Sequence, residues 1–503
     1  MKALSRGILD FGFNGILVDV ECHISNGLPA IIIVGVVSKA VDESKERIRS
    51  AFANSSINLP KKRITINIAP ADIPKDSTSL DLALAVSIMV AGKIIPSVPL
   101  NLALIGELGL DGSIRGIRGI IGKILAGKKS GIRTFIVPNS NAKQANLIPD
   151  VTILSVDNLH DLYLFLSGAL KITPANQKIN IPDTFANLND DFSFIVGQQT
   201  AKRGIEIATA GGHNILLSGP PGTGKSMLAK SITSILPVLN VDEIIEVTHM
   251  HSLINHNYED IIFTRPFRSP HHTASSTAII GGGKNPKPGE ISLSHKGVLF
   301  FDEFPEFTSA TLEALRQPLE DKTVTISRAK DTLEFPAEFM LVATANPCPC
   351  GYFNTHKNCI CTNQQISRYQ HKLSGPIVDR IDIFTDVENV EHSKLLKQET
   401  PSERSSEIAK RVKSARTIQN KRLGDTRLNS SMTNQEIKKY AQLDQQSLNL
   451  LNSASSKLEL SPRSYMRTIK VARTIADIDN SRNINSSHIA EALQFRPKNN
   501  NKL

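Results

Sequence analysis

Residues 218–231 read SGPPGTGKSMLAKS, a glycine-rich turn that runs into a helical pattern and follows the apolar residues 215–217. The spacing G-x-x-x-x-G-K-S is that of a phosphate-binding loop, in which backbone N–H groups and the helix N-terminus face the phosphates. Lys225 is expected to bridge the β- and γ-phosphates, and Ser226 to ligate Mg²⁺. The stretch therefore predicts a P-loop α/β core that binds ATP. The predicted ATP-binding residues are Gly219, Pro220, Pro221, Gly222, Thr223, Gly224, Lys225 and Ser226.

Two later strand patterns add polar residues at their ends. Residues 297–303 read GVLFFDE, an apolar strand that ends in two carboxylates. Asp302 is placed to hold the Mg²⁺ shell, and Glu303 to orient or deprotonate the attacking water. A third strand, 339–345, ends at Asn346, whose amide can touch the γ-phosphate; the alternative is a turn-forming Asn before Pro347. The expected cofactors are ATP and Mg²⁺.

The chain has 503 residues, which suggests about three domains. Its 40% hydrophobic and 21% charged residues are typical of a soluble globular protein. Charged or polar residues interrupt the N-terminus and the longest apolar run, 82–92, is too short for a bilayer, so we expect a cytoplasmic protein without membrane association.

Charge is unevenly distributed. The net charge is +10, and residues 401–503 hold 19 Lys and Arg against nine Asp and Glu, which accounts for the whole excess. Such an excess suits a polyanion such as nucleic acid, although solvated helix faces would give the same count.

Pattern changes divide the chain into four segments. Residues 1–170 alternate strand and helix patterns and predict a mixed domain, and residues 171–191 are polar and Pro/Asn-rich, as in a linker. Residues 192–390 alternate strand and helix again around the nucleotide motifs. From 391 to 503 strand patterns disappear, and helices are predicted at 434–443, 445–458, 461–476 and 486–493, the third with Ser461 as N-cap and Pro462 at its first position.

Four of the five cysteines, Cys348, Cys350, Cys359 and Cys361, fall within 14 residues directly after Asn346. Two C-x-C pairs can place four thiolates around one Zn²⁺, which would stiffen the loop beside the γ-phosphate. The spacing departs from the usual C-x₂-C, so a reduced or redox-active loop is the alternative.

Two glycine- or turn-containing loops carry basic residues. An insertion at 264–296 places Arg268, Lys284 and Lys287 near three consecutive glycines, and a predicted hairpin at 323–335 places Arg328 and Lys330 at its turn. Such loops suit contact with a DNA backbone in a central pore. The alternative is that both loops only pack subunits together.

Longer strings carry a family resemblance. The P-loop, the Asp-Glu strand and the Asn-ending strand occur together with VGQQTAKRGIEIATAGGHN (196–214), RPFRSPHHTASSTAIIGGG (265–283), GPIVDRID (375–382) and SPRSYMRTIKVARTIAD (461–477). Over essentially the whole chain, this set resembles the ComM/YifB family of magnesium-chelatase-like AAA+ ATPases. The resemblance implies an arginine finger at Arg380 that acts on a neighbouring subunit's nucleotide, and a second sensor at Arg463. It also implies a homo-oligomer, a hexamer, with an AAA+ α/β core and an all-α C-terminal lid.

The N-terminal segment resembles the proteolytic domain of Lon proteases in PADIPKDSTSLDLALAVSIM (70–89) and in residues 106–132. Ser79 aligns with the nucleophile, but Ile121 aligns with the catalytic lysine and Lys123 lies two residues away. A helix turns residues two apart to different faces, so we expect a Lon-like α+β domain without protease activity.

These expectations combine into one functional hypothesis. A ring-shaped ATPase with basic loops predicts a DNA motor, and the resemblance implies a branch-migration helicase for recombination intermediates in natural transformation, with single-stranded or branched DNA as partner. The alternatives are a magnesium-chelatase-type motor and a nucleotide-gated regulatory scaffold that does not translocate.

Overall fold

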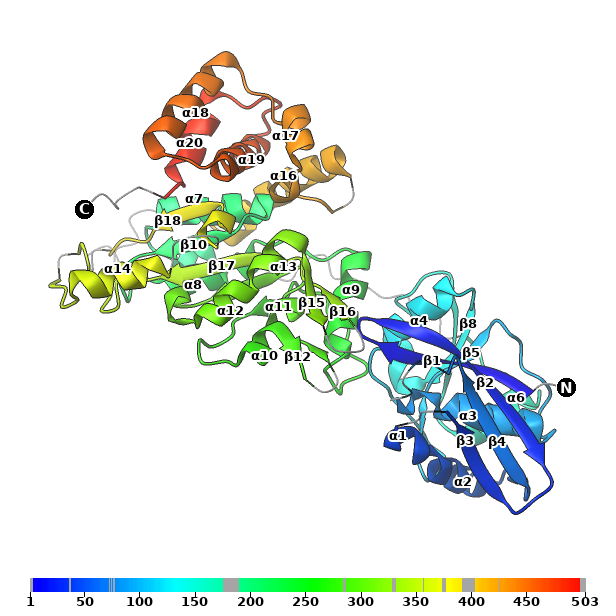
Figure 1. Ribbon diagram of the computed structural model, residues 1–503. Coiled ribbons are helices and arrows are strands. Elements are labelled where there is room, and N and C mark those ends of the chain that lie inside the picture. The colour runs from blue at the N-terminus through cyan, green and yellow to red at the C-terminus, as the bar shows by residue number, and fades with distance from the viewer. Residues whose placement is uncertain are drawn as a thin grey trace.

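The computed structural model describes residues 3–35, 38–71, 73, 75, 77–174, 190–283, 286–327, 332–355, 357–372, 377–390, 403–424 and 426–497. Most of the predicted linker at 171–191 lies outside these residues. Figure 1 shows an N-terminal α+β part, a central α/β part and a C-terminal helical part, arranged one after another along an elongated molecule. Within the described residues, no helix combines the length and hydropathy required of a transmembrane span.

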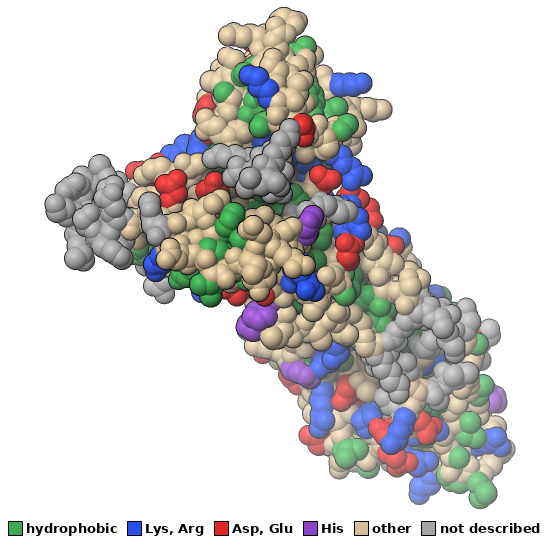
Figure 2. Space-filling view, turned by 60° about the vertical axis from the view of Figure 1, so that its left-hand side comes forward, with side chains coloured by type: hydrophobic (Ala, Val, Ile, Leu, Met, Phe, Trp, Pro, Cys, Tyr) green, Lys and Arg blue, Asp and Glu red, His purple; other side chains and the backbone are tan. Residues whose placement is uncertain are grey.

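The N-terminal part is built on a four-stranded sheet in the order β1 (Ala3–Phe11), β2 (Asn14–Ser25), β4 (Arg63–Ala69) and β3 (Ala30–Val34). The β3–β4 pair is parallel and the others are antiparallel. Helix α3 (Asp81–Ala91) is apolar on almost every side, because residues 81–89 are all buried. On the face in Figure 2, Lys and Arg side chains alternate with Asp and Glu over this lower part, so its surface there carries no single sign of charge.

The N-terminal part also contains a second sheet, which is parallel and has the strand order β5-β8-β9. The elements of this part not yet described follow in chain order. They are α1 (Lys39–Asp42), α2 (Ser44–Asn54), β5 (Leu102–Leu104), β6 (Glu107–Leu108), β7 (Ile114–Arg115), α4 (Ile120–Lys129), β8 (Thr134–Pro138), α5 (Ala142–Ala145), β9 (Thr152–Val156) and α6 (Leu159–Leu166).

The central part contains a five-stranded parallel sheet in the order β11-β14-β17-β10-β18. Its strands are β10 (Ile215–Ser218), β11 (Phe267–Arg268), β14 (Val298–Phe301), β17 (Met340–Ala345) and β18 (Ile383–Asp386). Nearly all residues of β10, β14 and β17 are buried, as expected for strands covered on both faces. Because the strands are parallel, all their carboxyl ends lie at one edge, where α/β sheets bind ligands.

Helices and two short hairpins complete the central part. They are α7 (Gln199–Gly211), α8 (Lys225–Ser231), α9 (Val241–Ser252), α10 (Ser276–Ile280), β12 (Gly281–Gly282), β13 (Lys287–Pro288), α11 (Glu290–Leu293), α12 (Ser309–Ala314), α13 (Arg316–Asp321), β15 (Thr323–Ser327), β16 (Thr332–Pro336) and α14 (Asn363–His371).

The described C-terminal residues form helices and turns but no strand, which confirms the predicted helical region. Three predicted helices are confirmed with shifted ends, and α18 (Gln445–Leu458) matches its prediction; the others are α17 (Asn434–Tyr440), α19 (Pro462–Ile478) and α20 (Ser486–Gln494). The Ser461 side chain caps α19 by accepting a hydrogen bond from the Ser464 N–H. The sequence analysis missed α16 (Ser405–Leu423), whose buried face includes polar Ser405 and Gln419 and therefore lacks a continuous apolar stripe.

The N-terminal part packs on helix α9 of the central part. Ile121, at the position of the Lon lysine, belongs to one apolar cluster with Ile244 and Val247 of α9. The Lys143 ammonium forms an ion pair with Glu259 at 2.6 Å beside this contact. The helix face that would present a catalytic amine instead contributes to an interdomain core.

Candidate nucleotide site and neighbouring clusters

The predicted P-loop lies between the end of β10 and the start of α8. Gly222 and Gly224 have φ values of 80° and 87°, a left-handed conformation that favours glycine. Gly219 is required for a different reason: a Cβ there would lie 2.2 Å from the carbonyl oxygen of Val387, just after β18. The backbone after β18 therefore lies so close to the loop that a side chain at position 219 would clash with it.

The two carboxylates at the end of β14 are held in different ways. The Asp302 carboxylate accepts hydrogen bonds from the hydroxyls of Ser226, at 3.0 Å, and Thr344, at 2.6 Å. The pair Ser226 and Asp302 thus provides hard oxygen ligands on one side of the loop, which suits Mg²⁺. Glu303 has a left-handed backbone, and its N–H donates to the Thr344 hydroxyl at 2.9 Å, so its exposed carboxylate points elsewhere.

Lys225 connects the loop with the end of β17. Its ammonium donates to the carbonyls of Gly219 and Pro220, both at 2.7 Å, and to the Asn346 side-chain oxygen at 3.1 Å. Burial lowers the pKa of Lys225, and the carboxylates Asp302 and Glu303 oppose this effect. Residues from β10, β14 and β17 therefore converge as predicted, on the chemistry of an Mg²⁺-dependent ATPase.

The predicted arginine finger, Arg380, and the predicted second sensor, Arg463, meet at one acidic residue of their own subunit. Glu320, on α13, lies 2.6 Å from the Arg380 guanidinium and 3.6 Å from that of Arg463. The Arg380 side chain is 8% exposed, whereas that of Arg463 is 63% exposed. The structure of one subunit thus brings both arginines together, and the roles of Arg380 toward a neighbour's nucleotide and of Arg463 as a second sensor stay predictions.

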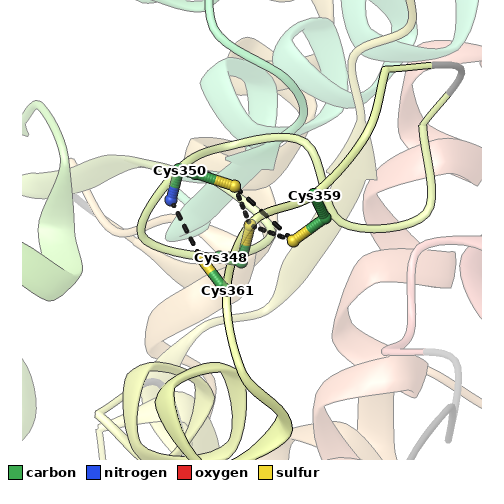
Figure 3. A group of neighbouring side chains, drawn as sticks. All are labelled: Cys348, Cys350, Cys359 and Cys361. Atoms are coloured by element: carbon green, nitrogen blue, oxygen red, sulfur yellow. Dashed lines mark hydrogen bonds between the residues drawn. The ribbon is translucent and has the colours of Figure 1, made fainter.

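The four clustered cysteines bring their sulfur atoms together (Figure 3). The Cys348, Cys350 and Cys359 sulfurs are 3.4 to 3.7 Å apart, and the four sulfurs lie within 4.8 Å of one another. Four sulfurs around Zn²⁺ at about 2.3 Å would be about 3.8 Å apart, so the donor set fits this ion. The Tyr352 backbone N–H lowers the pKa of the Cys350 thiol to about 6.

The cysteine loop also contacts the nucleotide site directly. A Cβ added to Gly351 would lie 2.6 Å from the Pro221 ring, so this loop packs on the P-loop. Pro347, which joins Asn346 to Cys348, has its carbonyl hydrogen-bonded by Gln370 of α14. A change in the shape of the cysteine loop would therefore be transmitted to both Pro221 and Asn346.

The two predicted DNA-contacting loops form neighbouring hairpins. In the β12–β13 hairpin, a Cβ on Gly281 would lie 3.2 Å from the Ile326 side chain of β15. Lys287 is exposed, whereas the Arg268 guanidinium makes two hydrogen bonds of 2.6 Å with Glu290. Arg268 is thus engaged within its own subunit, and its predicted contact with DNA stays untested. Lys284, Arg328 and Lys330 lie outside the described residues.

Comparison with known sequences identifies the family. Sequence models described as magnesium chelatase subunit ChlI match residues 191–395 and 20–141, and one for the ChlI C-terminal region matches residues 402–496. The chain is 42% identical over 494 residues to the competence protein ComM of Haemophilus influenzae, covering 96% of this chain and 95% of that protein. The chain belongs to the ComM/YifB family of magnesium-chelatase-like proteins.

Further relatives extend this comparison. The YifB protein of Escherichia coli is 42% identical over 488 residues, covering 96% of this chain and 95% of that protein, and a Mycobacterium tuberculosis protein is 35% identical over 491 residues, covering 96% of each chain. The Lon protease of Solibacter usitatus is 32% identical over 181 residues, covering 35% of this chain and 22% of the protease. These findings support an AAA+ ATPase with partial Lon similarity.

In this ComM/YifB member the Lon-like serine and lysine are engaged in structural contacts. Ser79 is buried, and its hydroxyl donates to the Ile8 carbonyl and accepts from Ser77. The Lys123 ammonium donates to the Asp10 carboxylate and, at 2.8 Å, to the Arg118 carbonyl. Ser79 and Lys123 share no hydrogen bond among the described residues, which agrees with the predicted loss of protease chemistry.

Sequence reasoning missed two side chains that position this site. Thr344 holds both Asp302 and the Glu303 backbone, and Glu320 holds the two arginines. Thr344 could have been found from strand alternation, because residues two apart face the same side and Asn346 was already assigned. Glu320 lies on a helix far in sequence from Arg380, and no local pattern connects them.

Proposed function

We propose that this ATPase is a ring-shaped DNA motor and that it drives branch migration of recombination intermediates during natural transformation. The Haemophilus influenzae relative is called competence protein ComM, which supports a role in competence. The structural support is the contact between Gly281 and Ile326, because it joins the two hairpins predicted independently to reach DNA. Both hairpins belong to the part that contains the nucleotide site, so nucleotide state and DNA contact have a common support.

Hydrolysis in this proposal is shared between adjacent subunits of a homo-oligomeric, hexameric ring. One subunit supplies Lys225, Ser226, Asp302, Glu303 and Asn346, and its neighbour supplies Arg380, while Arg463 closes the helical lid on the nucleotide. Arg380 leaves Glu320 when the neighbour's γ-phosphate offers it a stronger negative partner. Arginine fingers accelerate phosphoryl transfer by about 10³- to 10⁵-fold, which explains how assembly would control turnover.

The cysteine cluster has a structural role in this proposal. Cys348, Cys350, Cys359 and Cys361 hold one Zn²⁺ in closed tetrahedral coordination, which leaves no position for catalysis. The bound ion would fix the loop that contacts Pro221 and follows Asn346. Zinc thus supports the geometry of the nucleotide site without taking part in hydrolysis.

The motor function is tested with purified protein, Mg²⁺-ATP and a labelled three-strand or four-way DNA junction. We expect wild-type protein to resolve the junction and Glu303→Gln to bind ATP without resolving it. Glu313→Gln is the matched control, since Glu313 is an exposed carboxylate on α12 whose ion pair among the described residues is with nearby Arg316. Junctions that wild-type protein leaves intact across salt and Mg²⁺ concentrations, despite active hydrolysis, would contradict the proposal.

The zinc site is tested by metal analysis of protein purified without added metal. We expect about one Zn²⁺ per chain, and its loss in Cys359→Ser combined with Cys361→Ser. Cys22→Ala is the control, because Cys22 is buried in the N-terminal part and burial raises the pKa of its thiol to about 12. Metal-free wild-type protein with an intact fold, or equal zinc in the double variant, would exclude this site.

A further inference from the structure

A cavity lies at the opposite edge of the central sheet from the nucleotide site. Together with its mouth, which is open to solvent, it holds about 600 Å³ of free space. Its lining comes from segments that precede strands, including Gly212 before β10, Gly297 before β14 and Phe339 before β17. The P-loop, Asp302 and Asn346 follow the same strands, so the two sites are separated by at least the strand length, about 13 to 20 Å.

The C-terminal helical part forms the other wall of this cavity. Arg416 of α16 and Leu428, Ser430 and Ser431 of the following turn line it from that side. Arg416 donates two hydrogen bonds, at 3.0 and 2.7 Å, to the Thr209 carbonyl of α7. A molecule bound here would touch both the core and the lid region.

The cavity carries more positive than negative side chains. Its lining cations are Arg265, Lys296, Lys322 and Arg416, and its lining carboxylates are Glu243 and Glu338. Two of the cations are neutralised, because Arg265 pairs with Glu243 at 2.8 Å and Lys296 with Glu338 at 2.5 Å. These pairs use both carboxylates and leave two cations.

The remaining two cations lack an acidic partner. Among the residues that the structure describes, none places a carboxylate oxygen within 4 Å of Lys322 or Arg416. Burial lowers the pKa of Lys322. Burial, together with the charge of Arg265, lowers the pKa of Arg416 to about 9, which still leaves it charged at neutral pH. The carboxylates around Lys322 and Arg416 are paired with other cations. Partly buried like charges in such surroundings are unfavourable, and an anion between them would relieve this cost.

We propose that this cavity binds the phosphate or pyrophosphate group of a small molecule, held by Lys322 and Arg416 between the core and the C-terminal lid. Arginine offers several donors in a fixed plane and lysine a compact charge, a combination that suits phosphate oxygens. The Ser430 hydroxyl supplies a further donor on the lid side. Binding does not rest on the proposed motor function, although a bound anion would fix α16 relative to the core.

Pyrophosphate binding at constant ionic strength tests the proposal, measured by calorimetry and by thermal melting. The protein carries Lys225→Ala, which weakens phosphate binding at the P-loop. We expect saturable binding that Lys322→Gln weakens at least tenfold and Arg416→Gln weakens similarly. Lys457→Gln, an exposed basic residue on α18, is the matched control and should bind as the parent does.

Each of the other outcomes argues against phosphate binding in this cavity. Equal affinity in Lys322→Gln and the parent would place the pyrophosphate elsewhere, and melting shifts that chloride reproduces would show an ionic-strength effect only. If Arg416→Gln destabilises the fold, Lys322→Gln decides, because the Lys322 side chain forms no hydrogen bond or ion pair among the described residues. Competition with inorganic phosphate and with a nucleoside diphosphate distinguishes a free anion from a nucleotide as the ligand. Binding of a short oligonucleotide but not of pyrophosphate would contradict the proposal.

Discussion

At the scale of single residues, the hydroxyl of Thr344 links Asp302, the proposed metal ligand, and Glu303, the proposed catalytic carboxylate. It donates to Asp302 and accepts from the Glu303 N–H, and the side chain is almost fully buried. Asp302 and Glu303 are adjacent in sequence, yet one faces Ser226 and the other faces solvent because Glu303 is left-handed. Thr344 therefore acts as a positioning residue for both.

Thr344→Val tests this positioning role, because valine keeps the shape and removes the hydroxyl. We expect ATP turnover to fall about 10- to 100-fold and the Mg²⁺ concentration for half-maximal rate to rise, as when other supporting groups of metal sites are lost. Thr385→Val on β18 is the control: its hydroxyl is buried without a partner among the described residues, so its removal should leave turnover and stability nearly unchanged. An unchanged Mg²⁺ dependence in Thr344→Val would contradict the role.

His249 makes the interdomain contact sensitive to pH. Its Nε2 lies 2.6 Å from the Phe13 carbonyl of the N-terminal part, and burial lowers the pKa of the ring from 6.5 to about 4. Below pH 6.5 the unfolded chain binds a proton that the folded chain does not, so stability is lost as the pH falls toward 4. Between pH 7.5 and 5.5 this ring should cost about 1.4 kcal/mol.

Denaturant unfolding at these two pH values measures the effect. His249→Gln should lose the part of the pH dependence that belongs to this ring, while His23→Gln, at an exposed position of β2, should retain it. The same slope in His249→Gln and wild-type protein would show that His249 does not carry the effect.

At the scale of elements, the β12–β13 and β15–β16 hairpins support each other and the N-terminal part. Ile326 packs against Gly281, and Leu333 of β16 would lie 3.0 Å from a Cβ on Gly12 in the β1–β2 turn. Figure 1 shows β16 beside the tip of β1 and β2. The hairpins are thus held between the sheet of the core and the N-terminal part. A movement of either part would therefore displace the hairpins and be transmitted to the other part.

Charge removal at the two loops predicted to contact DNA tests that contact. Lys287→Gln, Lys284→Gln, Arg328→Gln and Lys330→Gln should each weaken binding to all sequences alike, and each should reduce the slope of log K against log salt by about one. Fluorescence anisotropy of labelled single-stranded DNA over a salt series gives that slope. Lys457→Gln, far along the chain on α18, should leave it unchanged, and equal slopes in every hairpin variant would assign DNA binding to another surface.

The sequence predicted the elements whose functional residues lie close together along the chain. The P-loop, the end of β14 and the capped start of α19 each have their chemistry within a few adjacent residues, and the structure confirms where they lie. The cysteine spacing likewise predicted thiols that can meet. In contrast, α16 was missed because Ser405 and Gln419 interrupt its apolar face. The docking of α4 on α9 and the basic cavity depend on contacts between distant segments, which no local pattern records.

At the scale of the whole molecule, neither Arg380 nor Arg463 is hydrogen-bonded to the P-loop, Asp302 or Asn346 among the described residues. Arg380 and Arg463 converge on Glu320 instead of on Lys225 within the chain. A finger supplied by a neighbour completes every site only if the subunits close into a ring, since an open chain would leave one end incomplete. The proposed sharing of the site thus calls for a closed ring, whereas the number of six subunits rests on the family resemblance alone.

Mixing two inactive variants tests this sharing of the site. Lys225→Ala removes the phosphate contact and Arg380→Ala removes the finger, so each alone should hydrolyse ATP at least about 10³-fold more slowly. In a random equal mixture about a quarter of the interfaces combine an intact Lys225 with an intact Arg380, so steady-state turnover should recover in rough proportion. Arg368→Ala, on exposed α14, replaces Arg380→Ala in the control mixture and should be active by itself. The contradicting result is a mixture that is as inactive as its components although sedimentation shows mixed rings. Arg380 would then act on the nucleotide of its own subunit, and hydrolysis would not be coordinated between subunits.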